Sequence, residues 1–295
     1  MGVNKIFIVG SGLMGSGIAQ AAITSGFEVV LNDVNMELLE KARTGIERMM
    51  AKSVEKGNLS DEDKNKALAR LTLSAELATA ADADMVIEAV YENEDLKKKI
   101  FSELSVICRE SAILASNTSS ISITALSSAV KNPSRFVGAH FFNPVPLMKL
   151  LEIIGGLSTS QATIEAVKEI GERMGKVCII SKDEPAFIVN RLLIPMLNEA
   201  TCLLERGVSS IEDIDKAAKN GMNHPMGPLE LIDMVGADVV YSSQEIIFKE
   251  TGDPKYRPSV LLKNMVNMGW LGLKTGKGFY LYSDDGNKTP NPDLI

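Results

Sequence analysis

Short apolar runs and helical stretches alternate at the start of the chain. Residues 6–9 form the first run and residues 27–32 contain the second, and both have the length and composition of buried parallel strands. Between them, residues 14–24 have the length of one helix. The order strand, helix, strand predicts a βαβ unit whose two strands lie parallel in one sheet.

A long charged stretch separates this unit from the next strand-like run at residues 71–73. Its first part, from Glu37 to Glu55, has a helical pattern and stops near Gly57. Ser60 is followed by three acidic residues, which is typical of the capped first turn of a second helix. We therefore expect a helical hairpin over about residues 36–70, and an insertion of this length usually has a function.

Residues 84–90 and 112–115 are two further apolar runs, separated by a helix expected at about 95–108. In open α/β sheets, ligands bind at the carboxyl ends of the strands. The polar residues that follow these two strands are therefore candidate ligand contacts. They are Glu92, Lys97, Asn117 and Ser119.

Residues 135–142 and 148–154 are the next two apolar runs, and the segment N143-P-V-P146 joins them. This connection is too short for a crossover helix, so the two strands should pair antiparallel. The midpoint of positions 140 and 152 falls at 146, inside the connection. A hairpin would therefore set His140 opposite Glu152 on one face of the sheet.

From about residue 187 the strand pattern gives way to helical periodicity. Helices are expected at about 187–205, 210–219, 228–250 with a break at Gly236, and 259–268. The residues after Ser283 are polar and resemble a loose tail. The expected domains are 1–185 with the hairpin, an all-helical domain over 186–283, and a tail over 284–295.

This pattern predicts an α/β fold class. The sheet should be Rossmann-like, doubly wound and mostly parallel, with the helical hairpin as an insertion. An all-α C-terminal domain should follow it.

Composition restricts the possible functions. The 295 residues carry a net charge of −7, so the chain lacks the basic surface that nucleic-acid binding requires. No apolar run approaches the ~18 residues of a membrane span. The three cysteines are far apart and odd in number, which favours a reducing compartment over a disulfide framework or a zinc site. Because the first strand begins so near the N-terminus, we expect a cytoplasmic protein without a targeting segment.

The segment G10-S-G-L-M-G15 follows the first strand and opens the first helix. Gly10 allows a tight turn, Gly12 lets a pyrophosphate approach the backbone, and Gly15 permits close packing of the helix on the strand. The first amides of the helix, near Leu13 and Met14, would face the phosphates. A purely structural glycine turn is the alternative explanation.

Asp33 ends the second strand at the distance from the glycines that dinucleotide binding requires. Its carboxylate can accept hydrogen bonds from both hydroxyls of an adenosine ribose, and it repels a 2′-phosphate. The sequence therefore predicts NAD as the cofactor, favoured over NADP.

His140 and His224 are the two histidines of the chain. Oxidation of a hydroxyl by NAD needs a base that titrates near neutral pH, as histidine does. His140, near the cofactor edge, fits this role, and Glu152 could orient its ring and favour the imidazolium formed in the reaction. The alternative is a buried structural histidine. His224 precedes a proline at a helix entrance, where a turn or capping role is the default.

Four other polar residues have structural explanations beside functional ones. Lys52 and Lys56 share one helical face and could hold phosphates or be solvated. Ser119 could bind a substrate oxygen or cap the following helix. Asn190, in an apolar run, is either a satisfied buried amide or a substrate contact.

Several segments together resemble the L-3-hydroxyacyl-CoA dehydrogenase family over essentially the whole chain, and within it the bacterial 3-hydroxybutyryl-CoA dehydrogenases. They are G10-S-G-L-M-G, A115-S-N-T-S-S, G138-A-H-F-F-N-P, M148-K-L-L-E, V189-N-R, H224-P-M-G-P-L-E-L and G276-K-G-F-Y. The resemblance implies an NAD-dependent enzyme that interconverts (S)-3-hydroxyacyl-CoA and 3-oxoacyl-CoA. It also implies a short acyl chain, a homodimer and no metal.

The resemblance assigns roles to single residues. His140 would be the base, Glu152 would orient it, and Ser119 with Asn190 would hold the 3-oxygen of the substrate. Lys52 and Lys56 would bind phosphates of coenzyme A. The implied cofactor contacts, besides the glycine segment and Asp33, are Glu92, Lys97, Asn117, Ser119, Asn143 and Lys274.

Two other functions stay open on the sequence alone. One is a β-hydroxyacid dehydrogenase that acts on a free acid and needs no coenzyme A site. The other is a non-catalytic NAD-binding structural protein, since a fold does not guarantee an activity.

Overall fold

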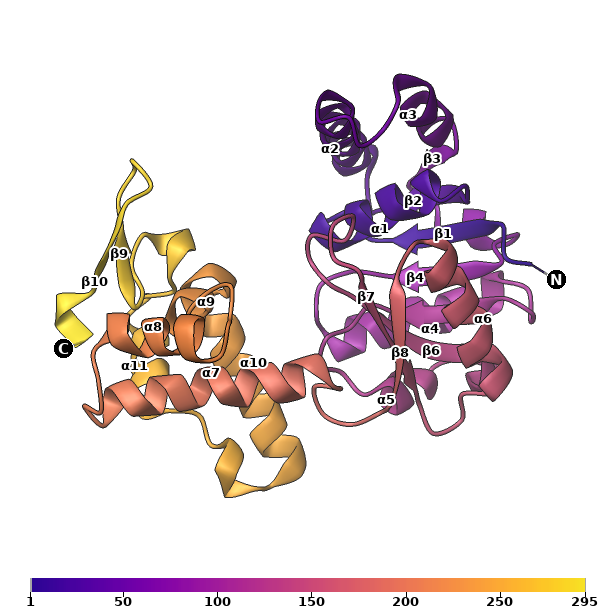
Figure 1. Ribbon diagram of the computed structural model, residues 1–295. Coiled ribbons are helices and arrows are strands. Elements are labelled where there is room, and N and C mark those ends of the chain that lie inside the picture. The colour runs from indigo at the N-terminus through magenta and orange to yellow at the C-terminus, as the bar shows by residue number, and fades with distance from the viewer. Residues whose placement is uncertain (1, 295) are drawn as a thin grey trace. The chain divides into compact units, whose positions relative to one another are not determined.

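The computed structural model describes residues 2–294 and divides into two compact units, one ending at Phe187 and the other beginning at Ile188 (Figure 1). The first unit is α/β and the second is mainly helical, which confirms the expected fold class. Among the described residues, no helix combines the length and the apolar character needed to cross a membrane.

An eight-stranded sheet forms the centre of the first unit, in the order β3-β2-β1-β4-β5-β6-β7-β8. The strands are β1 (Lys5–Val9), β2 (Glu28–Asn32), β3 (Leu71–Ser74), β4 (Met85–Glu88), β5 (Ile113–Ser116), β6 (Phe136–Phe141), β7 (Leu150–Gly155) and β8 (Val177–Lys182). All neighbouring strands pair parallel except β6 and β7, which form the expected antiparallel hairpin. The chain order reverses between β1 and β4, so a crevice opens where these two strands end.

Successive residues of the central strands enter two separate cores. Ile6 and Ile8 of β1 belong to one core, whereas Phe7 and Val9 belong to the other. Both faces of the sheet are therefore buried, which explains why its strands are apolar throughout. One face is covered by α1 (Leu13–Thr24), α2 (Met36–Glu55) and α6 (Gln161–Arg173), and the other by α4 (Glu94–Ile107) and α5 (Ile123–Ser127).

A helical hairpin of α2 and α3 (Asp61–Leu68) separates β2 from β3 (Figure 1). The side chain of Asn35 caps α2 by accepting from the Leu38 N–H at 3.0 Å. Ser60 caps α3, as its sequence indicates, by accepting from the Asp63 N–H at 3.0 Å. Each cap satisfies a backbone donor that the helix itself leaves without a partner.

Two elements of the first unit escaped the sequence analysis. α6 leads into β8, and β8 pairs parallel with β7 at the edge of the sheet. β8 begins with four apolar residues, V177-C-I-I180, but its side chains are only partly buried because it lies at this edge. The sequence analysis did not assign this run to a strand.

The second unit contains α7 (Val189–Glu205), α8 (Ile211–Gly221), α9 (Pro228–Val235), α10 (Ala237–Thr251) and α11 (Val260–Asn267). Gly236, with φ of 110°, separates α9 from α10 as expected. The segment after Ser283 is not a loose tail. β10 (Lys288–Pro290) pairs antiparallel with β9 (Tyr280–Tyr282), and the buried Asn291 side chain donates to the Gly278 carbonyl at 2.8 Å. Hydrogen bonds of polar groups order this segment. Its polar composition therefore resembled that of a disordered tail.

Two buried aspartates fix the C-terminal segment to the helices of the second unit. Asp233 of α9 accepts from the N–H groups of Phe279 and Tyr280, at 2.9 and 2.8 Å, and from the Tyr282 hydroxyl at 3.1 Å. Asp215 of α8 accepts from the Tyr280 hydroxyl at 2.7 Å. Burial raises the pKa of Asp233 to about 6, although its hydrogen bonds act in the opposite direction.

We predict that Asp233 makes the protein more stable at mildly acidic pH than a variant without this carboxyl. The pKa of Asp233 is about 6 in the folded state and about 4 in an unfolded chain. Between these values the folded state binds more protons, so the contribution of this group to the free energy of unfolding falls as pH rises.

Urea unfolding of the wild type and Asp233→Asn at about pH 4.5 and pH 7 measures this effect. The difference in free energy of unfolding between the two proteins should favour the wild type more at the lower pH, by about 2 kcal/mol. An equal difference at both pH values would contradict the raised pKa.

Candidate active site

The glycine segment after β1 forms the start of α1 at the crevice between β1 and β4. Gly10 has φ of 99°, and a Cβ there would lie 2.6 Å from the Ala89 carbonyl oxygen. A Cβ at Gly15 would clash with the Gly10 carbonyl, so both positions require glycine. By contrast, a Cβ at Gly12 would meet nothing within 4 Å, and no side chain caps α1. The first amides of α1 therefore face open space that can hold a phosphate group.

Asp33 follows β2 beside this segment. Its carboxylate accepts from the Ser11 N–H at 2.7 Å, the Ser11 hydroxyl at 2.6 Å and the Val34 N–H at 2.7 Å. Burial raises the pKa of Asp33, but the hydrogen bonds outweigh it and leave the pKa below its ordinary value. Asp33 is therefore ionised at neutral pH. It is partly exposed and can accept further hydrogen bonds from hydroxyl groups.

Glu88, the last residue of β4, is fully buried and ties three elements together. One carboxylate oxygen accepts from Lys97 Nζ at 2.6 Å and from the Val90 N–H at 2.7 Å. The other oxygen accepts from the Ser116 hydroxyl at 2.6 Å. Lys97 is only 1% exposed. A buried ion pair therefore fixes α4 to the ends of β4 and β5.

Glu92 extends this network to Ser119. Its carboxylate lies 3.2 Å from Lys97 Nζ and accepts from the Ser119 N–H at 3.0 Å and from the Thr118 hydroxyl. Burial raises the pKa of Glu92, but the charge of Lys97 and these hydrogen bonds hold the pKa below its ordinary value. Ser119 does not cap the following helix, because Ser122 is the cap of α5.

His140 on β6 lies directly opposite Glu152 on β7, in the register expected from the hairpin. His140 Nδ1 is 2.7 Å from Glu152 Oε2, and the two side chains are almost completely buried. The rings of Phe142 and Phe187 have their centroids 4.5 and 5.8 Å from that of the imidazole. The arrangement can orient an imidazole through Nδ1 and leave Nε2 to exchange a proton.

Asn117 connects the two parts of the site. Its Oδ1 accepts from the Phe141 N–H at 2.9 Å, and its own N–H donates to the Glu88 carbonyl at 2.8 Å. Four of the predicted residues consequently share the edge where β4, β5 and β6 end. They are Glu92, Asn117, Ser119 and His140.

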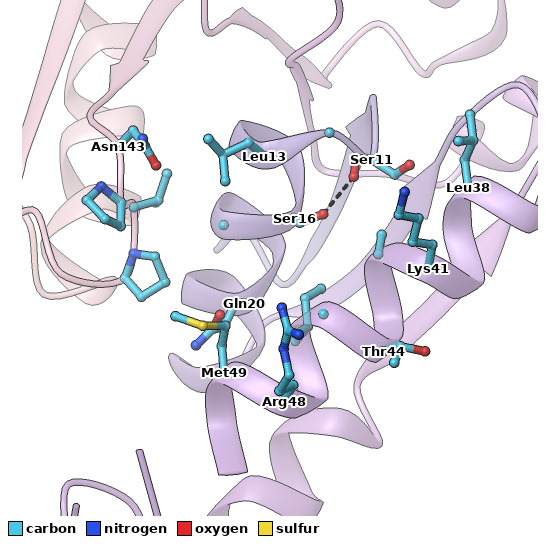
Figure 2. A pocket seen from close by; sticks show the side chains of 18 of the residues that line it. Ser11, Leu13, Ser16, Gln20, Leu38, Lys41, Thr44, Arg48, Met49 and Asn143 are labelled. Atoms are coloured by element: carbon cyan, nitrogen blue, oxygen red, sulfur yellow. Dashed lines mark hydrogen bonds between the residues drawn. The ribbon is translucent and has the colours of Figure 1, made fainter. Parts of the chain in front are cut away.

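A cavity of about 940 Å³ lies beside the glycine segment, between α1, α2 and the loop after β6 (Figure 2). Its volume is within the range of small-molecule sites. The lining includes the predicted cofactor residues Gly12, Leu13, Asp33 and Asn143. Its other polar side chains are Ser11, Ser16, Gln20, Lys41, Thr44 and Arg48.

The remaining predicted residues are not part of these groups. Lys52 and Lys56 are exposed at the end of α2, outside the cavity lining. Asn190 and Lys274 belong to the second unit. Asn190 is the second residue of α7, and Lys274 Nζ donates to Asp238 Oδ1 at 2.5 Å.

Comparison with known families agrees with this geometry. Residues 5–184 match the NAD-binding domain of 3-hydroxyacyl-CoA dehydrogenase, and residues 187–282 match the C-terminal domain of the same family. The chain belongs to the 3-hydroxyacyl-CoA dehydrogenase family. The resemblance inferred from its motifs is thereby confirmed, and this dehydrogenase is an NAD-dependent enzyme.

Individual relatives match over nearly the whole dehydrogenase. It is 48% identical to the 3-hydroxybutyryl-CoA dehydrogenase of Bradyrhizobium diazoefficiens over 280 residues, 95% of this chain and 96% of the relative. It is 44% identical to a probable 3-hydroxybutyryl-CoA dehydrogenase of Bacillus subtilis over 284 residues, 96% and 99% of the two chains. The crystal structure of (S)-3-hydroxybutyryl-CoA dehydrogenase from Ralstonia eutropha has a TM-score of 0.94 and 45% identity, and covers 96% of this chain and 100% of that one.

The roles assigned from the motifs do not include Glu88 or its partner Ser116, although Ser116 lies within the segment A115-S-N-T-S-S. The only signal in the sequence is a carboxylate at the end of the apolar strand M85-V-I-E88, because a buried carboxylate needs partners. Those partners come from α4 and β5, and their proximity depends on how the crossovers pack. Sequence spacing alone does not determine it.

We predict that Glu88→Ala lowers the free energy of unfolding of the dehydrogenase by about 3–5 kcal/mol, because Lys97 would lose its buried carboxylate partner and keep only the more exposed Glu92. Glu94→Ala is the matched control, since it removes a carboxylate from the partly exposed Glu94–Lys98 pair on the same helix. The control should change stability by less than about 1 kcal/mol. Chemical unfolding of both variants measures the difference. Equal losses of free energy of unfolding would show that the buried ion pair contributes no more to stability than the partly exposed one.

Proposed function

We propose that the enzyme interconverts (S)-3-hydroxyacyl-CoA and 3-oxoacyl-CoA with NAD, and that its substrate pair is 3-hydroxybutyryl-CoA and acetoacetyl-CoA. The observation that carries this proposal is the buried His140–Glu152 pair at 2.7 Å. It occurs in a chain that matches 3-hydroxybutyryl-CoA dehydrogenases at 44–48% identity over 94–96% of its length. NAD, when bound, supplies the acceptor for the hydride that leaves C3 of the substrate.

His140 moves the proton in this proposal. With Nδ1 held by Glu152, Nε2 of the neutral imidazole accepts the proton of the 3-hydroxyl group, and Glu152 stabilises the imidazolium that results. In the opposite direction the imidazolium donates the proton to the developing alkoxide. We assign Ser119 and Asn190 to hydrogen-bond the 3-oxygen and align it for transfer.

We assign the cofactor to the crevice between β1 and β4. The pyrophosphate would lie on the amides of Gly12, Leu13 and Met14, with Gly10 and Gly15 shaping the turn. The open space beside Gly12 and the ionised carboxylate of Asp33 support this assignment. The contacts that we assign to the rest of the dinucleotide are Glu92, Lys97, Asn117, Ser119, Asn143 and Lys274.

We assign Lys52 and Lys56 to the phosphates of coenzyme A. Both residues are exposed, Lys52 in the last turn of α2 and Lys56 as its C-cap, which makes them accessible to a ligand that binds the hairpin from solvent. The free-acid and non-catalytic alternatives are not favoured, because the matching relatives are named for a coenzyme A thioester substrate.

We further propose that the enzyme is a cytoplasmic homodimer. The second unit exposes large apolar side chains such as Leu192, Met222 and Met268, and exposed apolar surface commonly marks an interface. The cysteines are free thiols, which is compatible with a reducing compartment. Light scattering of the purified protein would determine its mass in solution.

The decisive assay is the loss of NADH absorbance with acetoacetyl-CoA, beside NADPH and beside free acetoacetate. Turnover of the thioester with NADH, and little with the other two combinations, is expected. No turnover of the thioester by protein that binds NADH would refute the proposed function.

We predict that His140→Gln lowers turnover by about 10²–10⁴-fold, the usual contribution of a general base, while NADH binding persists. His224→Gln is the matched control, because it makes the same substitution in a turn of the second unit. Turnover and NADH binding would be measured for both variants. Normal turnover in His140→Gln would refute the assignment of the base.

We also predict that Asp33→Ala raises KM for NADH and narrows the preference for NADH over NADPH, because the carboxylate that repels a 2′-phosphate is gone. Ser11→Ala removes one hydrogen bond to Asp33 but keeps the charge, so it should preserve the preference. The ratio of kcat/KM with the two cofactors is the measurement. An unaltered ratio in Asp33→Ala would contradict this role.

A further inference from the structure

The connection between β6 and β7 is longer than a tight hairpin turn. The ladder of the two strands ends at the pair Phe141–Leu151, so residues 142–149 lie outside it. One turn within the connection is closed by hydrogen bonds to the Pro144 carbonyl. Strand pairing alone therefore does not determine the shape of this segment.

This connection forms one wall of the cavity beside α1. Its residues 143–146 line the cavity, and Figure 2 shows Asn143 on the opposite side of it from Lys41 of α2. Val145 is buried against α1, where a Cβ on Gly17 would lie only 3.0 Å from the Val145 Cβ. The position of Asn143 in the cavity wall thus depends on how the connection is held.

The side chain of Lys176 donates to two carbonyl groups of this connection. Its Nζ lies 2.5 Å from the Val145 carbonyl oxygen and 2.9 Å from that of Met148. Lys176 is only 8% exposed, and burial lowers its pKa because it disfavours the charged form. The two carbonyl oxygens offset this cost only while both point at the ammonium group. The connection is therefore held in one shape.

The end of α6 places Lys176 within reach of the connection. Gly175, with φ of 71°, follows the helix, and its N–H donates to the Glu172 carbonyl at 2.9 Å. The Lys176 N–H donates to the Gly171 carbonyl at 2.9 Å, which completes a Schellman motif. β8 begins directly after Lys176 and pairs with β7, the strand into which the connection leads.

Lys176 differs from Lys97, the other buried lysine within residues 2–294. Lys97 is paired with the carboxylate of Glu88, whereas no salt bridge is formed by Lys176 in this part of the chain. An apolar side chain of similar length would fill the same space without the cost of a buried charge. The ammonium group of Lys176 is thus suited to fixing backbone geometry, and not to neutralising a carboxylate.

We propose that Lys176 is a positioning residue for the cofactor site. Its ammonium group holds the connection between β6 and β7 in the shape that places Asn143 against the dinucleotide. The inference rests on the proposed function, in which Asn143 is a cofactor contact. Lys176 is not part of the cavity lining, so it acts through the connection and not by touching NAD.

The test replaces Lys176 by Met, which keeps an apolar stem and removes the ammonium group. Lys149→Met is the matched control, because Lys149 is an exposed lysine of the same connection. Asn143→Ala and the double variant Lys176→Met/Asn143→Ala complete a double-mutant cycle. The Kd of NADH would be measured by its fluorescence without substrate, and KM for acetoacetyl-CoA at saturating NADH.

Lys176→Met should raise the Kd of NADH about three- to tenfold, because the connection loses both hydrogen bonds. KM for acetoacetyl-CoA should remain that of the wild type, and Lys149→Met should match the wild type in both constants. The effects of Lys176→Met and Asn143→Ala should not multiply, because one residue acts through the other. The double variant should bind NADH about as weakly as the weaker-binding single variant.

Lys176→Arg covers the case in which Lys176→Met does not fold, because a guanidinium keeps the charge and can donate to both carbonyls. The guanidinium is larger than the ammonium group and should displace the connection. The Kd of NADH should therefore rise above that of the wild type, but less than in Lys176→Met.

Two outcomes would overturn the proposal. One is wild-type affinity for NADH in Lys176→Met, or in Lys176→Arg where only that variant folds. The other is a pair of effects that multiply in the double variant, since Lys176 would then not act through Asn143. Failure of the proposed function is a separate result, because the wild type would then bind NADH without reducing acetoacetyl-CoA.

Discussion

The buried carboxylate of Glu88 constrains the whole edge of the sheet on which the site is built. A charge removed from water is stable only where hydrogen bonds and an opposite charge replace the solvent. Glu88 finds these partners in Lys97 of α4, the Val90 N–H after β4 and the Ser116 hydroxyl of β5. Satisfying one carboxylate therefore fixes three segments at once. Glu92 also pairs with Lys97 and accepts a hydrogen bond from the Ser119 N–H, so the same network positions the loop that contains Ser119.

A second buried carboxylate, Glu152 of β7, also needs a partner that replaces the solvent, and finds it on β6. Glu152 is also fully buried, and the imidazole of His140 lies against it. A lysine partner serves to fix geometry, whereas a histidine partner can gain and lose a proton near neutral pH. Glu88 is thus suited to holding the structure of the site, and Glu152 to supporting proton transfer by His140.

The features that could be predicted from the sequence are those set by local pattern. The central strands are buried on both faces, so each is a continuous apolar run. The turn at residues 143–146 is short, so the position of its midpoint in the sequence is enough to predict that His140 lies opposite Glu152. The pairing of Glu88 with Lys97 could not be predicted from sequence spacing, because it depends on how a helix packs against a strand in the tertiary structure. The order of the segment after Ser283 was hidden for a related reason, since buried Asp233 and Asn291 hold it through polar groups.

Charge is unevenly distributed along the lining of the cavity beside α1. Asp33 carries the negative charge of the lining, whereas Lys41 and Arg48 on α2 are positive. NAD presents free ribose hydroxyls, which a carboxylate accepts well, and coenzyme A presents a ribose 3′-phosphate, which the same carboxylate repels. The cations attract that phosphate and offer no acceptor to a ribose hydroxyl. Opposite charges at separate positions of one cavity would therefore distinguish a ribose with free hydroxyls from a ribose that carries a phosphate.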